Sequence, residues 1–499
     1  MGILFGNGKP QGPPIVASDK VVQLSEHDDT DVYRSIVLSL MLRFDDVLNP
    51  EKLHGALEKL LNRDGWRRIG KLEYHIPERY DENRPSFEYT HVQHGIPISE
   101  HPLGSQVPNG FTGDSPAILP SALHLVPLMR APNAPRTLKD YLEYDRPQIH
   151  LYVISFTDAT LVSFTFPHTL WDAMGMGEFL TAWTAVLAGR DHDVRPFHNY
   201  DTDPLKDMGR ECKETHKLAD QQLSILQLIV FGLRRWWDQM MFKEEGRIIC
   251  IPKSYIQSLR ETALGELKAG PSLRNDGGSE DELFLSDGDL LMSWIGRVVV
   301  KYTPLNPGQT VVLYNAFGMR PLLAEDVIPS TAAYVGNAVS AVYTLLRAGD
   351  ISTRPFGFAA TEARRSLTEQ RTREQLEALT AMTRESIQKT GYPPLFGDGT
   401  MQLVIMTNWS KAKLFEMDFS PAVVSKANAS PPEEGEETKK RGPVGRPSFI
   451  QPFGDSDYSV RYAFQVSGRD ADGNYWLSAM LRKKSWAPLE EALKRGEMI

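Results

Sequence analysis

Residues 150–168 limit the possible folds more than any other part of the chain. They hold two apolar runs rich in β-branched and aromatic residues, which flank Asp158 and predict a β-hairpin. The second run ends just before His168, and residues 172–189 then predict a helix that Gly189 closes. A side chain at a strand end, directly before a helix, is held rigidly. We therefore expect His168 to stand at the mouth of a cleft.

Other segments predict a chain that alternates strands and helices. Residues 31–44 indicate a buried strand, and Asn49 with Pro50 predicts the start of a helix whose apolar residues recur at helical spacing. Residues 62–75 favour another strand, and residues 100–140 indicate loop because Pro, Gly and Ser are frequent there. We further expect a helix from Ser286 to Lys301 and strands near residues 309–315, 335–345, 401–407 and 459–467.

The length of the chain predicts two domains, because 499 residues exceed the size at which a single core stops growing. We expect an N-terminal domain at residues 1–190 and a C-terminal domain at residues 256–499. Residues 191–255 are expected to connect them, with an amphipathic helix over roughly residues 213–242. Residues 421–448 are poor in apolar residues and rich in charge and proline, so we expect a mobile surface loop there.

Composition excludes several classes of protein. The formal net charge is -9, which argues against a nucleic-acid-binding protein. Two cysteines, Cys212 and Cys250, exclude a disulfide framework, disfavour a cysteine zinc site and suit the cytosol. No apolar run has the length of a membrane span. The run 223–242 combines apolar residues with arginine and tryptophan; it fits a membrane-surface helix, but we favour a helix that packs on the core between domains.

One short pattern with chemical potential, His-x-x-x-Asp, occurs three times. The three pairs are His27/Asp31, His168/Asp172 and His216/Asp220. His27 lies in a charged loop and His216 on the polar side of a predicted helix start, so we expect both to be solvated. His168 differs, because it follows an apolar strand and precedes a helix rich in small residues. From the residues alone, a buried structural histidine is as good an interpretation as a catalytic one.

The segment HTLWDAMGMGEF (168–179) resembles the HxxxDG signature of the BAHD acyltransferases of plants and fungi. Four further segments resemble family motifs in the same order: NPEKLHGALEKLLNRDGWRRIGKL (49–72), YNAFGMRPLL (314–323), AYVGNAV (333–339) and TNWSKAKLFEMDFS (407–420). Ala173 replaces the usual glycine after Asp172, and Ser420 replaces the glycine of the DFG segment. In these departures the chain resembles the fungal branch of the family more than the plant branch.

The resemblance implies a fold, a co-substrate and a mechanism. The fold would be α/β, with two chloramphenicol-acetyltransferase-like domains, each a mixed sheet with flanking helices, and a channel between them. The co-substrate would be acyl-CoA, with acetyl-CoA favoured, and the acceptor a hydroxyl or amine of a small molecule, by analogy a secondary metabolite. No metal is implied, we expect a monomer, and the side chains that bind CoA stay unassigned.

The resemblance also implies roles for individual residues. His168 would be the general base that deprotonates the acceptor. Asp172 would pair with Arg320 rather than touch substrate. Thr407 and Trp409 would donate hydrogen bonds to the oxyanion of the tetrahedral intermediate. The remaining positions implied to support the structure are Asp418 and Gly175.

Three alternatives stay open on the sequence. A condensation enzyme that uses carrier-bound acyl groups has the same fold, but its motif wants a histidine where this chain has Pro167. A homologue that binds CoA or a small molecule without catalysis is compatible with Ala173 and the altered DFG segment. Finally, the basic end of residues 421–448 would suit a lid over the CoA phosphates instead of an idle loop.

Overall fold

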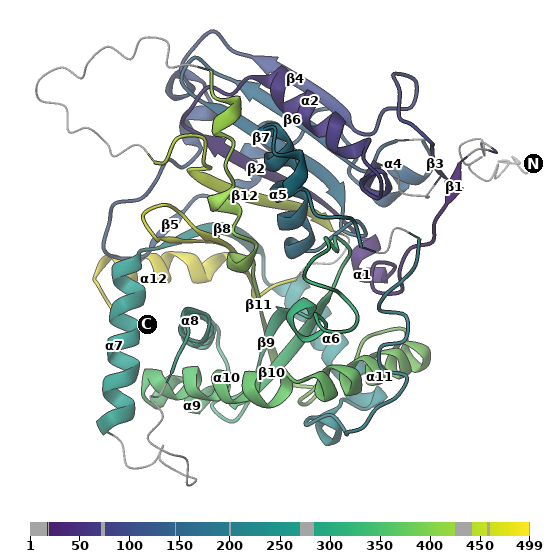
Figure 1. Cartoon of the computed structure of the whole chain (residues 1–499). Coiled ribbons are helices and arrows are strands. Elements are labelled where there is room, and N and C mark those ends of the chain that lie inside the picture. The colour runs from purple at the N-terminus through teal and green to yellow at the C-terminus, as the bar shows by residue number, and fades with distance from the viewer. Residues whose placement is uncertain are drawn as a thin grey trace, which may run out of the picture.

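The computed structural model describes residues 17, 19–70, 75–144, 146–198, 201–269, 284–424, 442–456 and 460–498. These residues form two large mixed sheets with helices packed on them, one sheet above the other in Figure 1. A short third ladder joins β1 (Lys20–Val21) to β3 (His75–Ile76). Most of the loop predicted at residues 421–448 lies outside the described residues.

The upper sheet carries the predicted hairpin at its centre. Its strand order among the described residues is β12-β2-β7-β6-β4, and only β4 and β6 pair in parallel. Helices α2 (Pro50–Leu61) and α5 (Ala173–Leu187) lie in front of it in Figure 1. The strands are β2 (Ile36–Phe44), β4 (Glu88–Gln93), β6 (His150–Ser155), β7 (Thr160–Pro167) and β12 (Phe449–Ser456).

The lower sheet has the order β10-β9-β11-β13-β14-β8-β5 among the described residues. Strand β11 pairs in parallel with both β9 and β13, and the other pairs are antiparallel. The strands are β5 (Ala117–Leu119), β8 (Glu244–Ile251), β9 (Thr310–Gly318), β10 (Val339–Arg347), β11 (Gln402–Asn408), β13 (Ala463–Arg469) and β14 (Tyr475–Arg482).

Each half of the chain lends one strand to the other half's sheet. Strand β12, from the C-terminal half, pairs along the whole of β2, and β5, from the N-terminal half, adds to β8. Backbone hydrogen bonds therefore cross between the halves within both large sheets. The mixed α/β architecture predicted from the sequence is confirmed, and the halves are more interleaved than a simple division into consecutive ranges implies.

The remaining helices surround these sheets. Helix α8 is buried along most of its length within the lower core, and α10 packs against it. The helices are α1 (Asp31–Arg34), α3 (Val126–Met129), α4 (Leu138–Leu142), α6 (Ile225–Met241), α7 (Lys253–Ala269), α8 (Asp287–Tyr302), α9 (Ala348–Thr353), α10 (Phe356–Gln370), α11 (Arg373–Thr390) and α12 (Lys483–Lys494).

Several local predictions are confirmed, whereas residues 100–140, which were expected to be loop, contain strand β5 and helix α3. Asn49 caps α2 by accepting a hydrogen bond from the Lys52 backbone, and Ser286 caps α8 in a reciprocal capping box. Two strand predictions are wrong in part. Residues 31–34 form the turn of helix α1, because Thr30 caps it, and β2 begins only at Ile36. The described part of residues 62–75 is mainly a 3₁₀ helix, Trp66–Gly70.

The crossover at residues 191–255 also differs from its prediction. Its helix, α6, begins at Ile225 because Ser224 caps it, so residues 213–224 are not α-helical. Residues 244–251 form β8, a strand inside the lower sheet. No residue of α6 is buried, so the expectation that its apolar face packs on the core is wrong.

Candidate active site

His168 stands directly after β7, at the edge of the upper sheet. Its backbone N–H donates to Ile36 O at 3.0 Å, which extends the ladder between β7 and β2 by one residue. The Tyr33 ring of α1 stacks on the imidazole, with ring centroids 4.4 Å apart and an interplanar angle of 17°. The side chain of Asn337, from the other half of the chain, donates to His168 O at 3.0 Å. Contacts from α1, from β2 and from Asn337 thus fix this residue.

The surroundings of His168 favour the neutral imidazole. Burial lowers the pKa of His168 below its ordinary value of 6.5, and the charge of Asp172 opposes this only in part. A neutral ring at neutral pH has a free lone pair, which is the form that accepts a proton from an acceptor hydroxyl or amine.

Asp172 is buried, and hydrogen bonds engage both of its carboxylate oxygens. Oδ1 accepts from Gly175 N at 2.8 Å and so caps α5, while Oδ2 accepts from Ala338 N at 2.8 Å. Arg320 Nη1 also donates to Oδ2 at 2.8 Å. Arg320 in turn donates to the carbonyl of Gly336 at 2.7 Å. The predicted pairing of Asp172 with Arg320 is therefore present, and it links the two halves of the chain.

A second acidic residue supports Asn337 from behind. Asp28 Oδ1 accepts from the Asn337 backbone at 2.6 Å and from its side chain at 2.8 Å, and Ser25 donates to Oδ2 at 2.6 Å. Burial raises the pKa of Asp28 to about 6, against its ordinary value of 3.8. Asp28 thus holds Asn337, and Asn337 holds the backbone carbonyl of His168, the candidate base.

Two glycines at the start of α5 allow the halves to approach closely. A Cβ on Gly175 would lie 1.8 Å from Val335 O, and one on Gly177 would lie 3.0 Å from Ala412 O. The first distance is impossible for any side chain, so Gly175 is required for this junction. The predicted structural role of Gly175 has a clear steric basis here.

Thr407 and Trp409 lie at the end of β11, where the second half of the chain meets α5. Trp409 Nε1 donates to Thr407 Oγ1 at 3.2 Å, and both side chains are partly buried. Trp409 packs against the same apolar cluster as Leu170 and Trp171, which follow His168. In this arrangement the threonine hydroxyl keeps its own proton to donate, whereas the indole N–H is already engaged.

Asp418 and Phe419 lie in positions that fit a structural role. Asp418 is exposed, and its side chain accepts from Ser420 N at 2.9 Å. Phe419 is fully buried and packs edge-on against Phe44 and Trp183, with centroids 5.1 and 5.0 Å away. The segment joins a C-terminal loop to the core of the upper sheet.

The other two His-x-x-x-Asp matches differ from their predictions. His216 is 3% exposed, because its ring stacks on Phe396 and its Nδ1 accepts from Leu218 N at 3.3 Å. It lies before a short 3₁₀ helix, Ala219–Gln221, and burial lowers its pKa to about 4. His27 is partly buried, and burial also lowers its pKa. The expectation that both rings are solvated is wrong.

Sequence reasoning assigned no role to three residues that hold His168. The sequence predicts Tyr33 within a strand and Asp28 within a charged, solvated loop. Asn337 belongs to the quoted AYVGNAV segment, so its signal was visible. A small cavity of about 20 Å³, room for about one water molecule, lies beside Asp28 and Thr169.

Comparisons with known proteins bear on the family and the fold of the chain. A model of the Transferase family matches residues 125–425. The chain is 39% identical over 98% of both chains to the Penicillium decumbens protein named Transcriptional regulator calD, and 38% identical over 99% of both chains to Acetyltransferase adrJ of Penicillium rubens. Its fold is similar to the crystal structure of F. sporotrichioides TRI101 complexed with coenzyme A and T-2, with a TM-score of 0.64 and 15% identity over 95% of this chain and 98% of that chain. The predicted fold class is confirmed.

Proposed function

Because the chain belongs to the Transferase family, the BAHD-type acyltransferases that its motifs resemble, we propose that His168 is the general base of its acyl transfer. The enzyme transfers an acyl group from acyl-CoA to a small secondary-metabolite acceptor. Acetyl is the favoured group, since a relative with 38% identity is named an acetyltransferase. The observation that carries the proposal is the position of His168, fixed at a strand end where the two halves of the chain meet.

The reaction follows from a neutral imidazole at this position. His168 removes the proton of the acceptor hydroxyl or amine as the oxygen or nitrogen attacks the thioester carbonyl carbon. The tetrahedral intermediate then collapses, the C–S bond breaks, and the protonated His168 returns the proton to the CoA thiolate. No acyl-enzyme is required.

Asp172 acts through structure in this proposal. Its carboxylate receives hydrogen bonds from Gly175, Ala338 and Arg320, so its oxygens are already occupied. It fixes the start of α5 and with it the loop that carries His168. Asp172 and Arg320 are therefore positioning residues.

Thr407 is the direct donor to the oxyanion, and Trp409 acts through it. The hydrogen bond from Trp409 Nε1 to Thr407 Oγ1 orients the hydroxyl and strengthens it as a donor. This refines the pair assigned from the sequence, where both residues were expected to donate directly. Asp418 stays outside the chemistry and holds its own turn.

The proposal is tested with purified protein, acetyl-CoA or malonyl-CoA, and a panel of alcohols and amines. Transfer from free acyl-CoA is expected, and a requirement for a carrier protein would favour the condensation alternative. Thr407→Val should lower kcat by about 10²–10³-fold, as for a lost oxyanion donor. Trp409→Phe should lower it less. A larger loss in Trp409→Phe than in Thr407→Val would show that the indole is the direct donor.

A regulatory function is the second candidate, since a relative with 39% identity is named a transcriptional regulator. The net charge of -9 does not suit direct DNA binding, and the arrangement around His168 suits catalysis. CoA retention without turnover on any acceptor would favour a non-catalytic role. We place the enzyme in the cytosol, because both cysteines are free thiols, and we propose that it is a monomer.

A further inference from the structure

Helix α6 exposes an unusual amount of apolar surface. Nine large apolar side chains on its 17 residues are between 43% and 76% exposed. Isolated exposed apolar residues are ordinary, but a contiguous set on one element marks an interaction surface. The nine residues, called the α6 apolar face below, are Ile225, Leu226, Ile229, Val230, Leu233, Trp236, Trp237, Met240 and Met241.

The α6 apolar face is continuous. At 100° per residue, all nine side chains fall within an arc of about 160°, centred near Leu233. Arg234 borders one side of the arc, and Gly232 and Gln239 border the other. Leu228 and Phe231 lie on the opposite side and are partly buried against the protein. An ordinary surface helix turns its apolar side towards the core, whereas α6 turns its broad apolar side outward.

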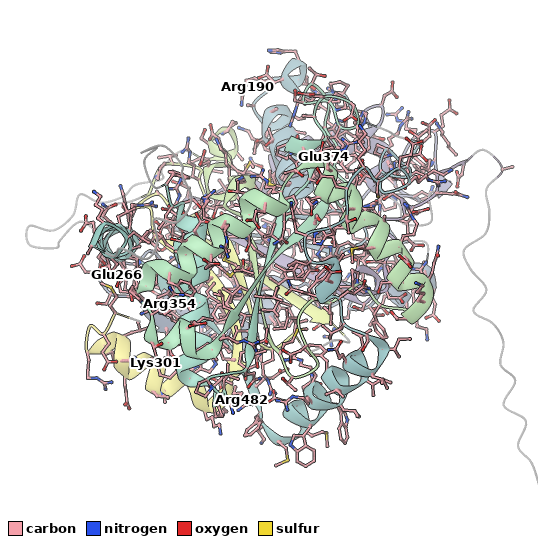
Figure 2. All side chains as sticks on the ribbon, turned by 90° about the horizontal axis from the view of Figure 1, so that it is seen from below. Arg190, Glu266, Lys301, Arg354, Glu374 and Arg482 are labelled. Carbon is pink, nitrogen blue, oxygen red and sulfur yellow. The ribbon has the colours of Figure 1, made fainter. Side chains whose placement is uncertain are left out.

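Specific contacts fix both ends of α6, and these contacts determine its orientation. Ser224 and Gln227 form a capping box at its start. At its end the buried Arg461 donates to the carbonyls of Asp238 at 3.0 Å and Phe242 at 2.6 Å. Arg461 and Arg482 both pair with the Asp238 carboxylate. In Figure 2, α6 lies at the edge of the molecule beside the labelled Arg482.

One side and the C-terminal end of the α6 apolar face carry exposed cationic residues, of which Lys483 also pairs with Glu245 at 3.5 Å. Arg234 is exposed on the helix, and Lys243, Lys483 and Lys484 are exposed near its C-terminal end. Lys484 Nζ lies 4.5 Å from the Phe242 ring, and Lys483 N donates to Lys243 O at 2.8 Å, which places these lysines together. The acidic Asp238 is already neutralised by its two arginines.

We propose that α6 docks this enzyme on the surface of a membrane that contains anionic phospholipid. The apolar face enters the boundary between headgroups and acyl chains, and the lysines and Arg234 contact lipid phosphates. Trp236 and Trp237 suit this boundary, because the apolar ring of tryptophan can contact acyl chains while its indole N–H donates to polar headgroups. Among the described residues no helix is long and apolar enough to cross a bilayer, so α6 lies in the membrane plane.

The width of the arc favours a membrane over a second copy of the chain. Two helices that pack together bury a narrow seam and would leave the flanks of a 160° face in water. A lipid surface covers the whole arc at once. The sequence favoured no membrane association, and the outward orientation of α6 is the finding that changes this expectation.

The test uses co-sedimentation of the full-length protein with vesicles of phosphatidylcholine containing about one-third phosphatidylserine. Wild type should sediment with the vesicles. Leu233→Glu/Trp237→Glu should weaken binding by about tenfold or more, because two apolar anchors are replaced by charges that anionic lipid repels. Leu123→Glu is the matched control, since Leu123 is 63% exposed and Leu233 is 61% exposed. It should sediment like wild type.

Two further measurements distinguish an anionic membrane from a second copy of the chain as the partner of α6. Arg234→Glu/Lys484→Glu should weaken binding to the anionic vesicles and leave the weaker binding to pure phosphatidylcholine unchanged. Sedimentation velocity without vesicles should show a single species that Leu233→Glu/Trp237→Glu does not alter. A dimer that this variant dissociates would overturn the membrane proposal in favour of a second copy. Equal sedimentation of wild type and Leu233→Glu/Trp237→Glu would also overturn it.

The variants also report on folding. All substituted side chains are exposed, so the melting temperature should stay within a few degrees of wild type. The inference does not depend on the proposed chemistry, because vesicle binding is measured without substrates. Loss of acyl transfer with vesicle binding intact would leave this proposal standing and count against the proposed function alone.

Discussion

His168 and His216 each precede an aspartate by four residues, yet they occupy very different places. His168 follows a central strand of the upper sheet and is held by contacts from α1, β2 and Asn337. His216 lies in a turn between the halves and packs on Phe396, while Asp220 is exposed. His216 is buried and His168 is partly buried, so burial alone does not identify the candidate base.

The difference lies in what the aspartate does. Asp172 caps a long helix and pairs with Arg320 across the junction of the two halves, so the loop between it and His168 is fixed at both ends. Asp220 belongs to a three-residue 3₁₀ helix and points to solvent. A four-residue spacing becomes a candidate site only where the fold anchors both residues.

The largest expected effect separates the two histidines by activity. His168→Ala should reduce kcat by about 10²–10⁴-fold, because the general base is lost while the backbone hydrogen bonds of residue 168 to Ile36 and Asn337 remain. His216→Ala should leave kcat within a few-fold of wild type. Steady-state kinetics with acetyl-CoA and an accepted alcohol measure both. A comparable loss in both variants would remove the distinction.

The aspartates should differ in stability. Asp172→Asn leaves the partly buried Arg320 without its anionic partner, at a cost of about 3–5 kcal/mol. The melting temperature should fall, together with activity. Asp220→Asn is the matched control, and at an exposed position it should change stability by less than about 0.5 kcal/mol. Thermal denaturation of both variants decides this, and an unchanged melting point for Asp172→Asn would contradict the anchoring role.

His216 should make stability depend on pH. Its folded pKa of about 4 is below the ordinary 6.5, so its contribution is fully present above pH 6.5 and is lost as the pH falls towards 4. His216→Phe keeps a ring against Phe396 and removes the titration. Melting temperatures from pH 7 to pH 4 should therefore fall less steeply in this variant. Parallel curves for the two proteins would contradict the assignment.

The smallest effect concerns the pH profile of the reaction. Burial lowers the pKa of His168, so the neutral base persists below pH 6.5 and the acid limb of kcat/KM should have its midpoint below that value. His216→Phe should leave this midpoint in place. A midpoint above 6.5 would show that the site stabilises the imidazolium instead.

Sequence patterns predicted the local elements that depend on nearby residues. The hairpin around Asp158, the caps at Asn49 and Ser286 and the helix closed near Gly189 all follow from residues within one or two turns. The errors arose where tertiary contacts decide. Residues 31–34 were expected to be strand but form α1, where Tyr33 stacks on His168. For α6, the sequence allowed both an outward and an inward apolar face, and the favoured inward orientation is wrong.

For the candidate site, the sequence by itself predicted His168, Asp172, Arg320 and the Thr407–Trp409 pair as candidates, because their motifs are local in sequence and occur in a family order. It did not identify Tyr33, Asn337 and Asp28 as the residues that hold His168, since a contact such as Asn337 with Asp28 joins positions 309 residues apart. Nor did it show that His216 is buried or that α6 faces solvent. Periodicity shows that a helix has an apolar side, but only the packed structure decides whether that side meets the protein core or the surroundings.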